Sequence, residues 1–498
     1  MRARVSCSSA ALFLLLAHLP FLSAPYFWDE AGQFIPASLD LFYSAEIVPH
    51  STIPNVHPPG LMLYLAAAWR LAGYSIVSTR VAMLLIAMLA CWPVYRLAAD
   101  YLCPDRKAAV MTLVLLCVSP LFFSQSIMTL LDMPAMALTA LSLLLFLRER
   151  MVLASFACVA LVMVKETGAL LPAVLGLALI REHRWKPSVL FLIPAFPLIG
   201  WLLVLHARSG HWFGNALFAQ YNLSYPLNPV RLALALFRRG YYLFIGTGYF
   251  IGTAALLKTR AVRDLNPWVA SRAWRIAGVF ALAHVVAMCL IGGAVLERYL
   301  LPVLPITLAA FANAICALTP RFRNVGFAAL LAASAACIFV DPIYPFPLEN
   351  NLAWTDFVQV QHDAAGYLSA RLPAGAAISS AFPFAGCMRR PELGYTLRRF
   401  LIDEVPDFTR PSLERLRGRH IDAFAIFSST SDPVGLMRNP RWIAFLQKFY
   451  GYEPDIAPDQ IPTVLGLHTV ARFERHGQWI EIFQPPMPKR VSELPPSQ

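Results

Sequence analysis

The sequence has 498 residues, of which 58% are hydrophobic and only 14% are charged, and its formal net charge is +12. A soluble globular chain carries roughly 25% charged residues, so much of this chain must be solvated by lipid. The basic residues form small clusters between apolar runs, which follows the positive-inside rule and excludes a continuous nucleic-acid-binding face. The nine cysteines show no paired spacing and lie mostly inside apolar runs, where cysteine behaves as a small hydrophobe. We therefore expect neither disulfides nor a metal site.

The N-terminal segment, MRARVSCSSAALFLLLAHLPFLSAP, has the layout of a signal peptide: a basic start, an apolar core and small residues before Pro25. We interpret it as an uncleaved first membrane span. The acidic motif WDE at residues 28–30 follows too closely for a processed terminus, and the next apolar segments continue the same topology.

A membrane span needs about 20 apolar residues. By this criterion the chain contains about eleven spans, at residues 8–25, 79–98, 108–127, 130–147, 151–164, 167–180, 187–206, 240–257, 276–295, 299–318 and 324–341. The N-terminus and alternate loops carry the cations, which are Arg2 and Arg4; Arg96, Arg106 and Lys107; Arg148 and Arg150; Arg181, Arg184 and Lys186; Lys258, Arg260, Arg263, Arg272 and Arg275; Arg321 and Arg323. The positive-inside rule places these loops in the cytoplasm.

Two of these spans, 151–164 and 167–180, are short and are separated by Lys165 and Glu166. At 1.5 Å per residue, the first would cover only about 21 Å of a hydrocarbon core about 30 Å thick. A single helix would instead bury an ion pair at the midplane and reverse all later loops. Because both flanks are cationic and should share a side, we expect a short hairpin that seats Lys165 and Glu166 in a recess below the outer surface.

Two long loops and a C-terminal region fall on the outer side. The loop 26–78 contains amphipathic segments suited to the membrane interface, and NPVRLALALFRRG in the loop 207–239 predicts an interfacial helix rather than a span. From residue 342 the composition becomes that of a soluble protein. There GAAISSAF and DAFAIFSS predict buried strands, RPSLERLRGR a helix and TVARFERHGQWIEIFQPP a hairpin. The sequence thus predicts an α-helical polytopic membrane protein, residues 1–341, with an extracytoplasmic soluble α/β domain, residues 342–498.

The same alternation of loops gathers ionisable residues at the outer ends of the spans. They are Asp29, Glu30, Asp132, Lys165, Glu166, Glu297 and Arg298. Ionisable groups at membrane depth are costly and are candidates for function. Their convergence on one face predicts a site.

Each group also has a structural interpretation. Asp29 could cap a helix, with Glu30 favourable to its dipole, or Asp29 could be a general base near the membrane surface. His57 in NVHPPGLMLY precedes two prolines, which hold it in extended geometry. His57 either belongs to a rigid turn into the next helix or donates a hydrogen bond to a phosphate.

The remaining groups are equally open when each is taken alone. Asp132 in TLLDMPAM could cap its helix, and Lys165 could pair with Glu166. Arg298 and Tyr299 in LERYLLPVLP could be a snorkelling cation and an interfacial aromatic. The gathering of all these residues on one side favours a functional site.

Together these motifs resemble the GT-C membrane glycosyltransferases. WDE in the first outer loop, HPP later in that loop, LDMP in the second, the KETG hairpin and ERYLLPVLP carry the resemblance. More narrowly, the chain resembles the branch that includes the protein O-mannosyltransferases and the lipid A aminoarabinose transferases. It departs from the mannosyltransferase pattern because HPPGLM lacks their lysine, and His57 stands where the aminoarabinose enzymes tend to carry a cation before the prolines. The acceptor therefore cannot be carried over from either subgroup.

The resemblance implies that a sugar moves, with inversion, from a polyprenyl-phosphate donor to an acceptor outside the cytoplasm. Asp29 would match the catalytic base and Asp132 the second-loop acid, and we group Glu30 with these catalytic acids. We expect Glu166, Tyr299 and Glu297 to support the site.

Departure of the polyprenyl phosphate develops negative charge, which cations fixed in a low-dielectric recess would stabilise. Lys165, Arg298 and His57 are the candidates for holding this donor phosphate. The sequence contains neither GxGxxG nor a Walker motif, so we expect no nucleotide cofactor, and no divalent metal is indicated.

The expected partners are the lipid-linked donor and a lipid, glycan or protein acceptor of the cell envelope, with no nucleic acid. We expect a multi-pass protein of the plasma (inner) membrane. The alternative is a transporter or flippase of lipid-linked or small polar substrates. Such a protein should have repeated halves and a site near the midplane, whereas here the acids gather on one face and no repeat is evident.

Overall fold

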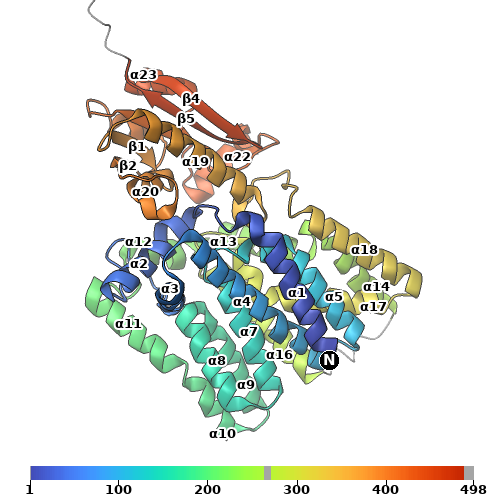
Figure 1. Cartoon of the computed structure of the whole chain (residues 1–498). Helices are drawn as coiled ribbons and strands as arrows, with labels where there is room; N and C mark the ends of the chain where they lie inside the picture. Colours follow the sequence, from blue (N-terminus) through green and yellow to red (C-terminus); the bar gives the residue numbers. More distant parts are fainter. Residues whose placement is uncertain (1, 263–270, 487–498) are drawn as a thin grey trace, which may run out of the picture. The chain divides into compact units, whose positions relative to one another are not determined.

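The computed structural model describes residues 2–262 and 271–486, and the chain divides into two compact units, Met1–Trp354 and Thr355–Gln498 (Figure 1). The sequence analysis placed residues 342–354 in the C-terminal domain, whereas here they belong to the first unit. The reason is a set of buried contacts that composition does not reveal. The Trp354 ring lies 5.5 Å from the Arg80 guanidinium, and Glu349 binds Arg298.

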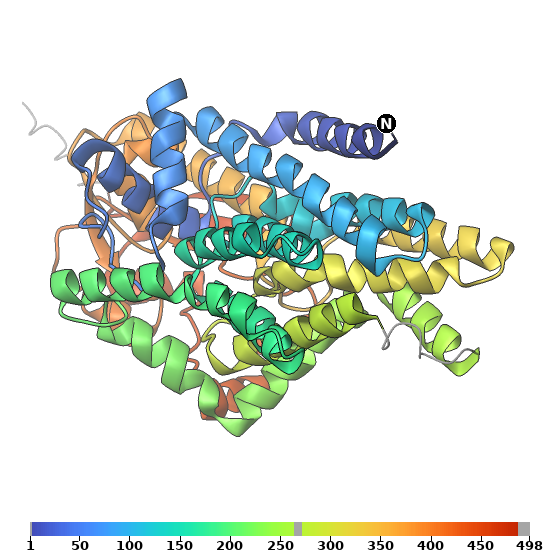
Figure 2. The same cartoon turned by 90° about the horizontal axis from the view of Figure 1, so that it is seen from below.

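The first unit is helical. Its helices are α1 (Arg2–His18), α2 (Ile35–Ser44), α3 (Gly60–Ala72), α4 (Ile76–Leu97), α5 (Arg106–Val118), α6 (Pro120–Gln125), α7 (Asp132–Leu147), α8 (Met151–Val164), α9 (Leu170–Arg181), α10 (Trp185–Ser188), α11 (Ala195–Ser209), α12 (Ala216–Ala219), α13 (Pro229–Phe244), α14 (Phe250–Val262), α16 (Arg272–Leu290), α17 (Leu304–Cys316) and α18 (Pro320–Ala336). Helix α7 packs against both α4 and α8 (Figures 1 and 2). The amphipathic segments predicted in the outer loops are helical, as α2, α3 and α13.

Four helical stretches of the described residues are long and apolar enough to cross a membrane: Ile76–Leu102, Trp185–Ser209, Arg272–Leu290 and Glu297–Cys316. Shorter apolar helices accompany them, at Ser6–Phe21, Gly60–Ala72, Asp132–Leu147, Met151–Val164 and Phe250–Thr259. Large apolar side chains such as Leu89, Phe156 and Phe196 are exposed, which water would penalise and lipid would not. The total of about eleven spans stays a prediction.

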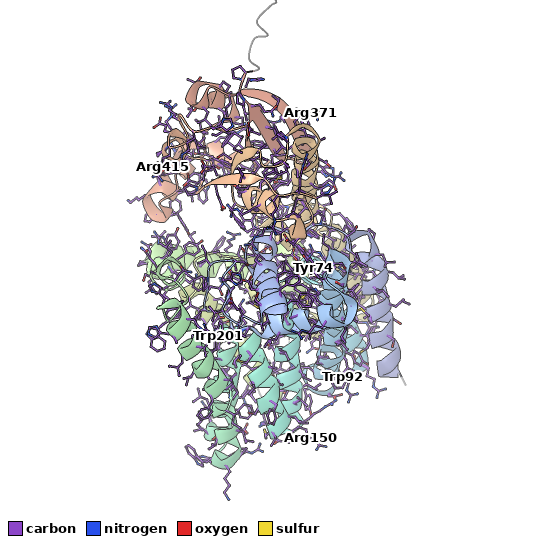
Figure 3. All side chains as sticks on the ribbon, turned by 60° about the vertical axis from the view of Figure 1, so that its left-hand side comes forward. Tyr74, Trp92, Arg150, Trp201, Arg371 and Arg415 are labelled. Carbon is purple, nitrogen blue, oxygen red and sulfur yellow. The ribbon has the colours of Figure 1, made fainter. Side chains whose placement is uncertain are left out.

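The short hairpin expected around Lys165 is present. Helix α8 ends at Val164, a 3-10 turn η4 (Glu166–Ala169) follows, and α9 begins at Leu170. Figure 3 shows Arg150, just before α8, at the end of the first unit far from Tyr74. The two short helices therefore bring Lys165 toward the other end of the unit without burying a charge in mid-helix.

Two predicted spans are not single helices: 108–127, which is divided between α5 and α6 at Ser119, and 240–257. The segment 240–257 was expected to be a single helix, but α13 continues to Phe244 and α14 begins only at Phe250. Thr247 has φ +52° and Gly248 has φ +82°, conformations that end a right-handed helix. Gly248 adopts its positive φ without steric cost, and the apolar composition of the segment concealed the break.

The cation-rich loops meet at one end of the helices. Arg148 binds Asp100 at 2.9 Å, and Arg184 binds Glu149 at 2.6 Å. Arg272, from a loop distant in sequence, also reaches Glu149 at 3.1 Å. The alternation read from the sequence therefore corresponds to a physical grouping of these loops. Which side of the membrane they face stays a prediction.

The second unit contains one sheet of the order β2-β1-β3-β5-β4. Its described elements are α19 (Ala353–Arg371, which begins at the division), β1 (Ala377–Ala381), α20 (Phe384–Arg389), β2 (Leu401–Val405), α21 (Arg410–Glu414), β3 (Ala423–Phe427), α22 (Pro440–Tyr450), α23 (Ile461–Leu465), β4 (His468–Arg475) and β5 (Gln478–Gln484). Strand β3 is central in this order; β1 pairs in parallel with β2 and β3, and β5 is antiparallel to β3 and β4.

These elements confirm both predicted strands and the hairpin, while the predicted helix in RPSLERLRGR is confined to α21. The sequence analysis missed β2, in which only Val405 is buried. An edge strand of this kind lacks the apolar pattern that identifies a buried strand.

Candidate active site

Arg298 is the centre of a cluster of carboxylates in the first unit. It lies in η9 (Glu297–Val303), a 3-10 segment that leads into α17, and is 4% exposed. Its Nη2 donates to Asp29 Oδ2, its Nη1 donates to Glu349 Oε2 at 2.9 Å, and its Nε lies 3.3 Å from Asp132 Oδ2. One guanidinium thus joins three carboxylates from segments that are far apart in the sequence.

Lys165 completes this cluster from the tip of the α8–α9 hairpin. Its Nζ donates to Asp132 Oδ1 at 2.5 Å and lies 4.3 Å from the centre of the Tyr299 ring. Both Lys165 and Asp132 are buried. A buried cation between a carboxylate and an aromatic face is held in one orientation, because leaving it unpaired would cost several kcal/mol.

His57 and Glu166 form the neighbouring pair. His57 Nδ1 lies 2.8 Å from Glu166 Oε2, so the alternative in which Lys165 pairs with Glu166 is wrong. Adjacent residues at the hairpin tip point to different partners, and only the fold brings those partners within reach. Burial would raise the pKa of Glu166, but the charge and hydrogen bond of His57 and the charge of Lys165 outweigh it and lower that pKa.

The loop that carries His57 is pressed against the hairpin. A Cβ on Gly60, at the end of the HPPG motif, would lie 2.4 Å from the backbone oxygen of Met163. Trp201 of α11 donates to the backbone oxygen of Val56 at 2.8 Å. These contacts hold the backbone of the loop in the position in which the His57 side chain pairs with Glu166.

Asp29 is the accessible carboxylate of the cluster. Its side chain is 36% exposed, whereas those of Asp132 and Glu349 are 3% and 6% exposed. Trp28 before it has φ +39°, a region that bulky residues rarely occupy. After it the chain forms one π-helical turn, η2 (Glu30–Phe34), and both features recur at functional sites.

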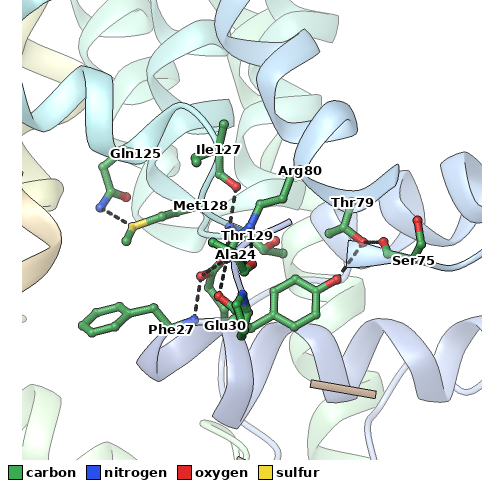
Figure 4. Close-up of polar contacts among 12 residues, drawn as sticks. Ala24, Phe27, Glu30, Ser75, Thr79, Arg80, Gln125, Ile127, Met128 and Thr129 are labelled. Carbon is green, nitrogen blue, oxygen red and sulfur yellow. Dashed lines mark hydrogen bonds and ion pairs between the residues drawn. The ribbon is translucent and has the colours of Figure 1, made fainter. Parts of the chain in front are cut away.

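Glu30 faces a different environment from Asp29. Its carboxylate and the Arg80 guanidinium are fully buried and form an ion pair (Figure 4). Glu30 also accepts from the backbone N–H groups of Phe27 at 2.9 Å and Thr129 at 2.6 Å. With its oxygens occupied in this way, Glu30 is placed to hold the turn that presents Asp29.

The other predicted supporting residues bind neighbouring segments. Glu297, 5% exposed, accepts from Arg238 Nε of α13 at 2.9 Å and from Asn350 Nδ2 at 3.1 Å. Tyr299 lies under both Lys165 and Arg298, whose guanidinium is 5.5 Å from its ring. The structure therefore brings Asp29, Asp132, Lys165, Arg298 and Tyr299 together, with the His57–Glu166 pair beside them.

Two residues of this region escaped the sequence analysis. Arg80 is a lone charge in the apolar run 79–95, a signal that could have identified it as the partner of a buried acid. Glu349 gave no comparable signal, because it lies in a polar stretch that reads as the start of a soluble domain. In the described ranges 2–262 and 271–486, no group of three or more His, Cys, Asp or Glu residues is arranged to hold a metal ion.

No protein-family model and no curated protein matches this sequence. Among solved structures, ArnT from Cupriavidus metallidurans bound to undecaprenyl phosphate is 15% identical, with a TM-score of 0.56 over 96% of this chain and 97% of that one. The apo state of the same protein gives a TM-score of 0.52 at 14% identity, over 95% and 98% of the two chains. Arabinofuranosyltransferase AftD from Mycobacteria also matches, with a TM-score of 0.46 over 97% of this chain but only 39% of its own. The chain therefore has the fold of the ArnT structures, and its resemblance to the GT-C proteins is confirmed at the level of the fold.

Proposed function

We propose that the chain is a multi-pass membrane glycosyltransferase that moves a sugar from a polyprenyl-phosphate donor to an acceptor. The observation that carries this proposal is the cluster around Arg298, in which a partly exposed Asp29 lies beside two buried cations. The cluster stands on a fold shared with ArnT, of which one structure holds undecaprenyl phosphate. Such a cluster provides cations that can bind an anionic lipid head group and a carboxylate that can act as a base.

In the proposed reaction, an acceptor hydroxyl lies at hydrogen-bond distance from Asp29. Asp29 takes its proton, the acceptor oxygen bonds to the anomeric carbon, and the bond from that carbon to the phosphate oxygen breaks. The electron pair leaves with the polyprenyl phosphate, and attack opposite the leaving group inverts the anomeric centre. General-base catalysis of this kind contributes roughly 10²–10⁴-fold.

Arg298 and Lys165 supply the positive charge for the leaving phosphate. Both are buried, and fixed charges in a water-poor site stabilise developing negative charge more than they would in water. Asp132 orients Lys165 through their 2.5 Å contact. His57 assists from the loop, held by Glu166.

The acceptor belongs to the cell envelope as a lipid, glycan or protein, and the site lies on the outer side of the plasma (inner) membrane together with residues 342–498. Cysteines placed at the exposed positions Tyr43 and Ser429, in a chain without its native cysteines, should react with an impermeant maleimide in intact cells. A cysteine at Arg150, near the cation-rich end, should react only after permeabilisation. Labelling of only one of the first two positions would contradict this topology.

The direct test uses purified protein in nanodiscs with radiolabelled polyprenyl-phosphate sugars and envelope lipid extracts. Asp29→Asn keeps the shape of the side chain but removes the base, so transfer should be abolished while folded yield is retained. Asp459→Asn, at an exposed position of the second unit, is the matched control. Equal transfer by Asp29→Asn and the wild type would remove Asp29 from the mechanism.

The alternative of a transporter or flippase receives no specific support. A transport site is expected near the middle of the bilayer, between broken helices. Here the charged groups lie at helix ends: Asp132 begins α7, Lys165 follows α8 and Arg298 precedes α17. Movement of the intact lipid-linked donor across the bilayer, without any transfer product, would be required to reopen that alternative.

A further inference from the structure

Glu349 is a buried carboxylate with half of its hydrogen-bonding capacity unused. It lies in η10 (Leu348–Asn350) and is 4% exposed. Its Oε2 accepts from Arg298 at 2.9 Å, but its Oε1 has no hydrogen-bond partner among the described residues. A buried carboxylate oxygen without a donor costs free energy, and binding a proton would turn that oxygen into a donor.

The neighbours of Glu349 do not supply the missing donor. Gln125 of α6 donates its Nε2 to the backbone oxygen of Glu349 at 3.2 Å, and its own Oε1 is unpartnered in the described structure. The Oδ1 of Asn350 is likewise unpartnered there. The described contact of the carboxylate is therefore the one with the cation Arg298.

The charges of the cluster do not balance when every acid is ionised. Arg298 and Lys165 provide two positive charges, whereas Asp29, Asp132 and Glu349 provide three negative ones. Within these direct ion pairs there is one more carboxylate than cation, before any anionic substrate has arrived; the buried Arg239 lies further out, 5.8 Å from the centre of the Tyr299 ring.

Burial and several charged groups act on the carboxyl group of Glu349. Burial has the largest effect and raises the pKa of Glu349 to about 7; Arg298 opposes this rise, while the charges of Asp29, Asp132 and Glu297 add to it. Tyr299, also part of η9, lies against the same guanidinium. Glu349 therefore changes its charge near neutral pH.

We propose that Glu349 couples donor binding to proton uptake: it binds a proton from solvent as an anionic phosphate takes over the Arg298 guanidinium. This inference rests on the proposed function and names how the same site accepts its substrate. No covalent bond changes in the step. The carboxylate gains one proton, and the negative charge that it loses is replaced by that of the phosphate.

The coupling has a definite sign. An anion favours the protonated form of Glu349, so by linkage a proton at Glu349 favours the anion equally. Below about pH 7 the proton is already present, and affinity should not depend on pH. Above it, each molecule that binds the anion must also take up a proton, so affinity should fall by up to tenfold per pH unit.

The test measures binding to the full-length protein in nanodiscs from pH 6 to pH 8.5. The probe is undecaprenyl methyl phosphate, a diester that keeps a single negative charge over this range, and undecaprenol serves as the phosphate-free control. Glu349→Gln keeps an acceptor for Arg298 and mimics the protonated acid. Glu414→Gln, an exposed position in α21, is the matched control for removing a carboxylate.

Near pH 6, the wild type and Glu349→Gln should bind the diester equally. At pH 8 the variant should bind about tenfold more tightly than the wild type, with no pH dependence of its own. The wild type and Glu414→Gln should behave alike. Undecaprenol should show no pH-dependent difference between any of the proteins.

A second measurement needs no variant. Calorimetry of diester binding to the wild type at pH 7.5, in two buffers of different ionisation enthalpy, should report uptake of about three quarters of a proton. Wild-type binding without proton uptake, or the same pH dependence in Glu349→Gln, would overturn the role of Glu349 and leave the proposed function standing. Failure of the wild type to bind the diester at any pH would instead count against the proposed function.

Discussion

Glu30 and Arg80 form an ion pair in which neither side chain is exposed to solvent. Arg80 also donates to the backbone oxygens of Pro25 and Ile127, both at 2.9 Å. The pair therefore ties the start of the first outer loop to the segment before α7. Asp29, one residue away, is left partly exposed, so the two adjacent acids lie in different environments.

Loss of either member of this pair should destabilise the protein. Arg80→Ala leaves Glu30 charged and without its cation, which costs about 3–5 kcal/mol for a buried pair. The double variant Glu30→Leu/Arg80→Met should be more stable than Arg80→Ala, because no buried charge remains. Thermal unfolding in one detergent checks this order. If the double variant is the less stable of the two, the ion pair with Glu30 is not the main way in which Arg80 stabilises the protein.

The sequence predicted which residues meet but not how they pair. The alternation of cationic loops was sufficient to place Asp29, Asp132, Lys165 and Arg298 at one end of the helices, because topology alone decides which ends share a side. Pairing depends on distances of a few ångströms between segments far apart in the chain. No local pattern encodes these, so the contact between Lys165 and Asp132 could not be foreseen.

The same limit explains the wrong helix and the missed residue. The break between α13 and α14 depends on backbone angles at Thr247 and Gly248, whereas the apolar composition there is that of a continuous span. Glu349 was assigned to a soluble domain because its neighbours in sequence are polar. Burial against Arg298 is a tertiary property, and it overrides the composition of the surrounding segment.

A methyl group on Gly60 should disturb the loop that carries His57. Gly60→Ala would place a Cβ 2.4 Å from the Met163 backbone oxygen, and forcing such a contact typically costs about 1–3 kcal/mol. We expect lower thermal stability and weaker donor binding. Gly200→Ala in α11 is the matched control, because nothing lies within 4 Å of its added Cβ. Equal losses in the two variants would contradict the close packing at Gly60.

The His57–Glu166 pair should make stability depend on pH in the acid range. The pKa of Glu166 is lower in the folded protein than its usual value, so ionisation of Glu166 stabilises the folded state. The resulting stabilisation is present above about pH 4.3, the reference value for Glu, and is lost as the pH falls through the folded-state pKa. The Glu166→Gln variant should therefore lose less stability than the wild type between pH 6 and pH 3.5, as measured by thermal unfolding. Parallel losses in both proteins would contradict this assignment.

Variants of Lys165 can distinguish a role in stabilising the fold from a role in binding the donor phosphate. It is buried between Asp132 and the Tyr299 ring, so Lys165→Ala both removes a cation and leaves Asp132 with only Arg298. If Lys165 stabilises the leaving phosphate, turnover at saturating donor should fall by at least about tenfold, the effect of roughly 1.4 kcal/mol on the barrier. The double variant Asp132→Asn/Lys165→Met removes the buried charges together and should recover folded yield, but it should not recover turnover. The measurement is the rate normalised to monodisperse protein. Recovery of turnover together with folded yield would show that Lys165 acts only through the packing of the cluster. Binding of the phosphate would then have to depend on Arg298 and His57.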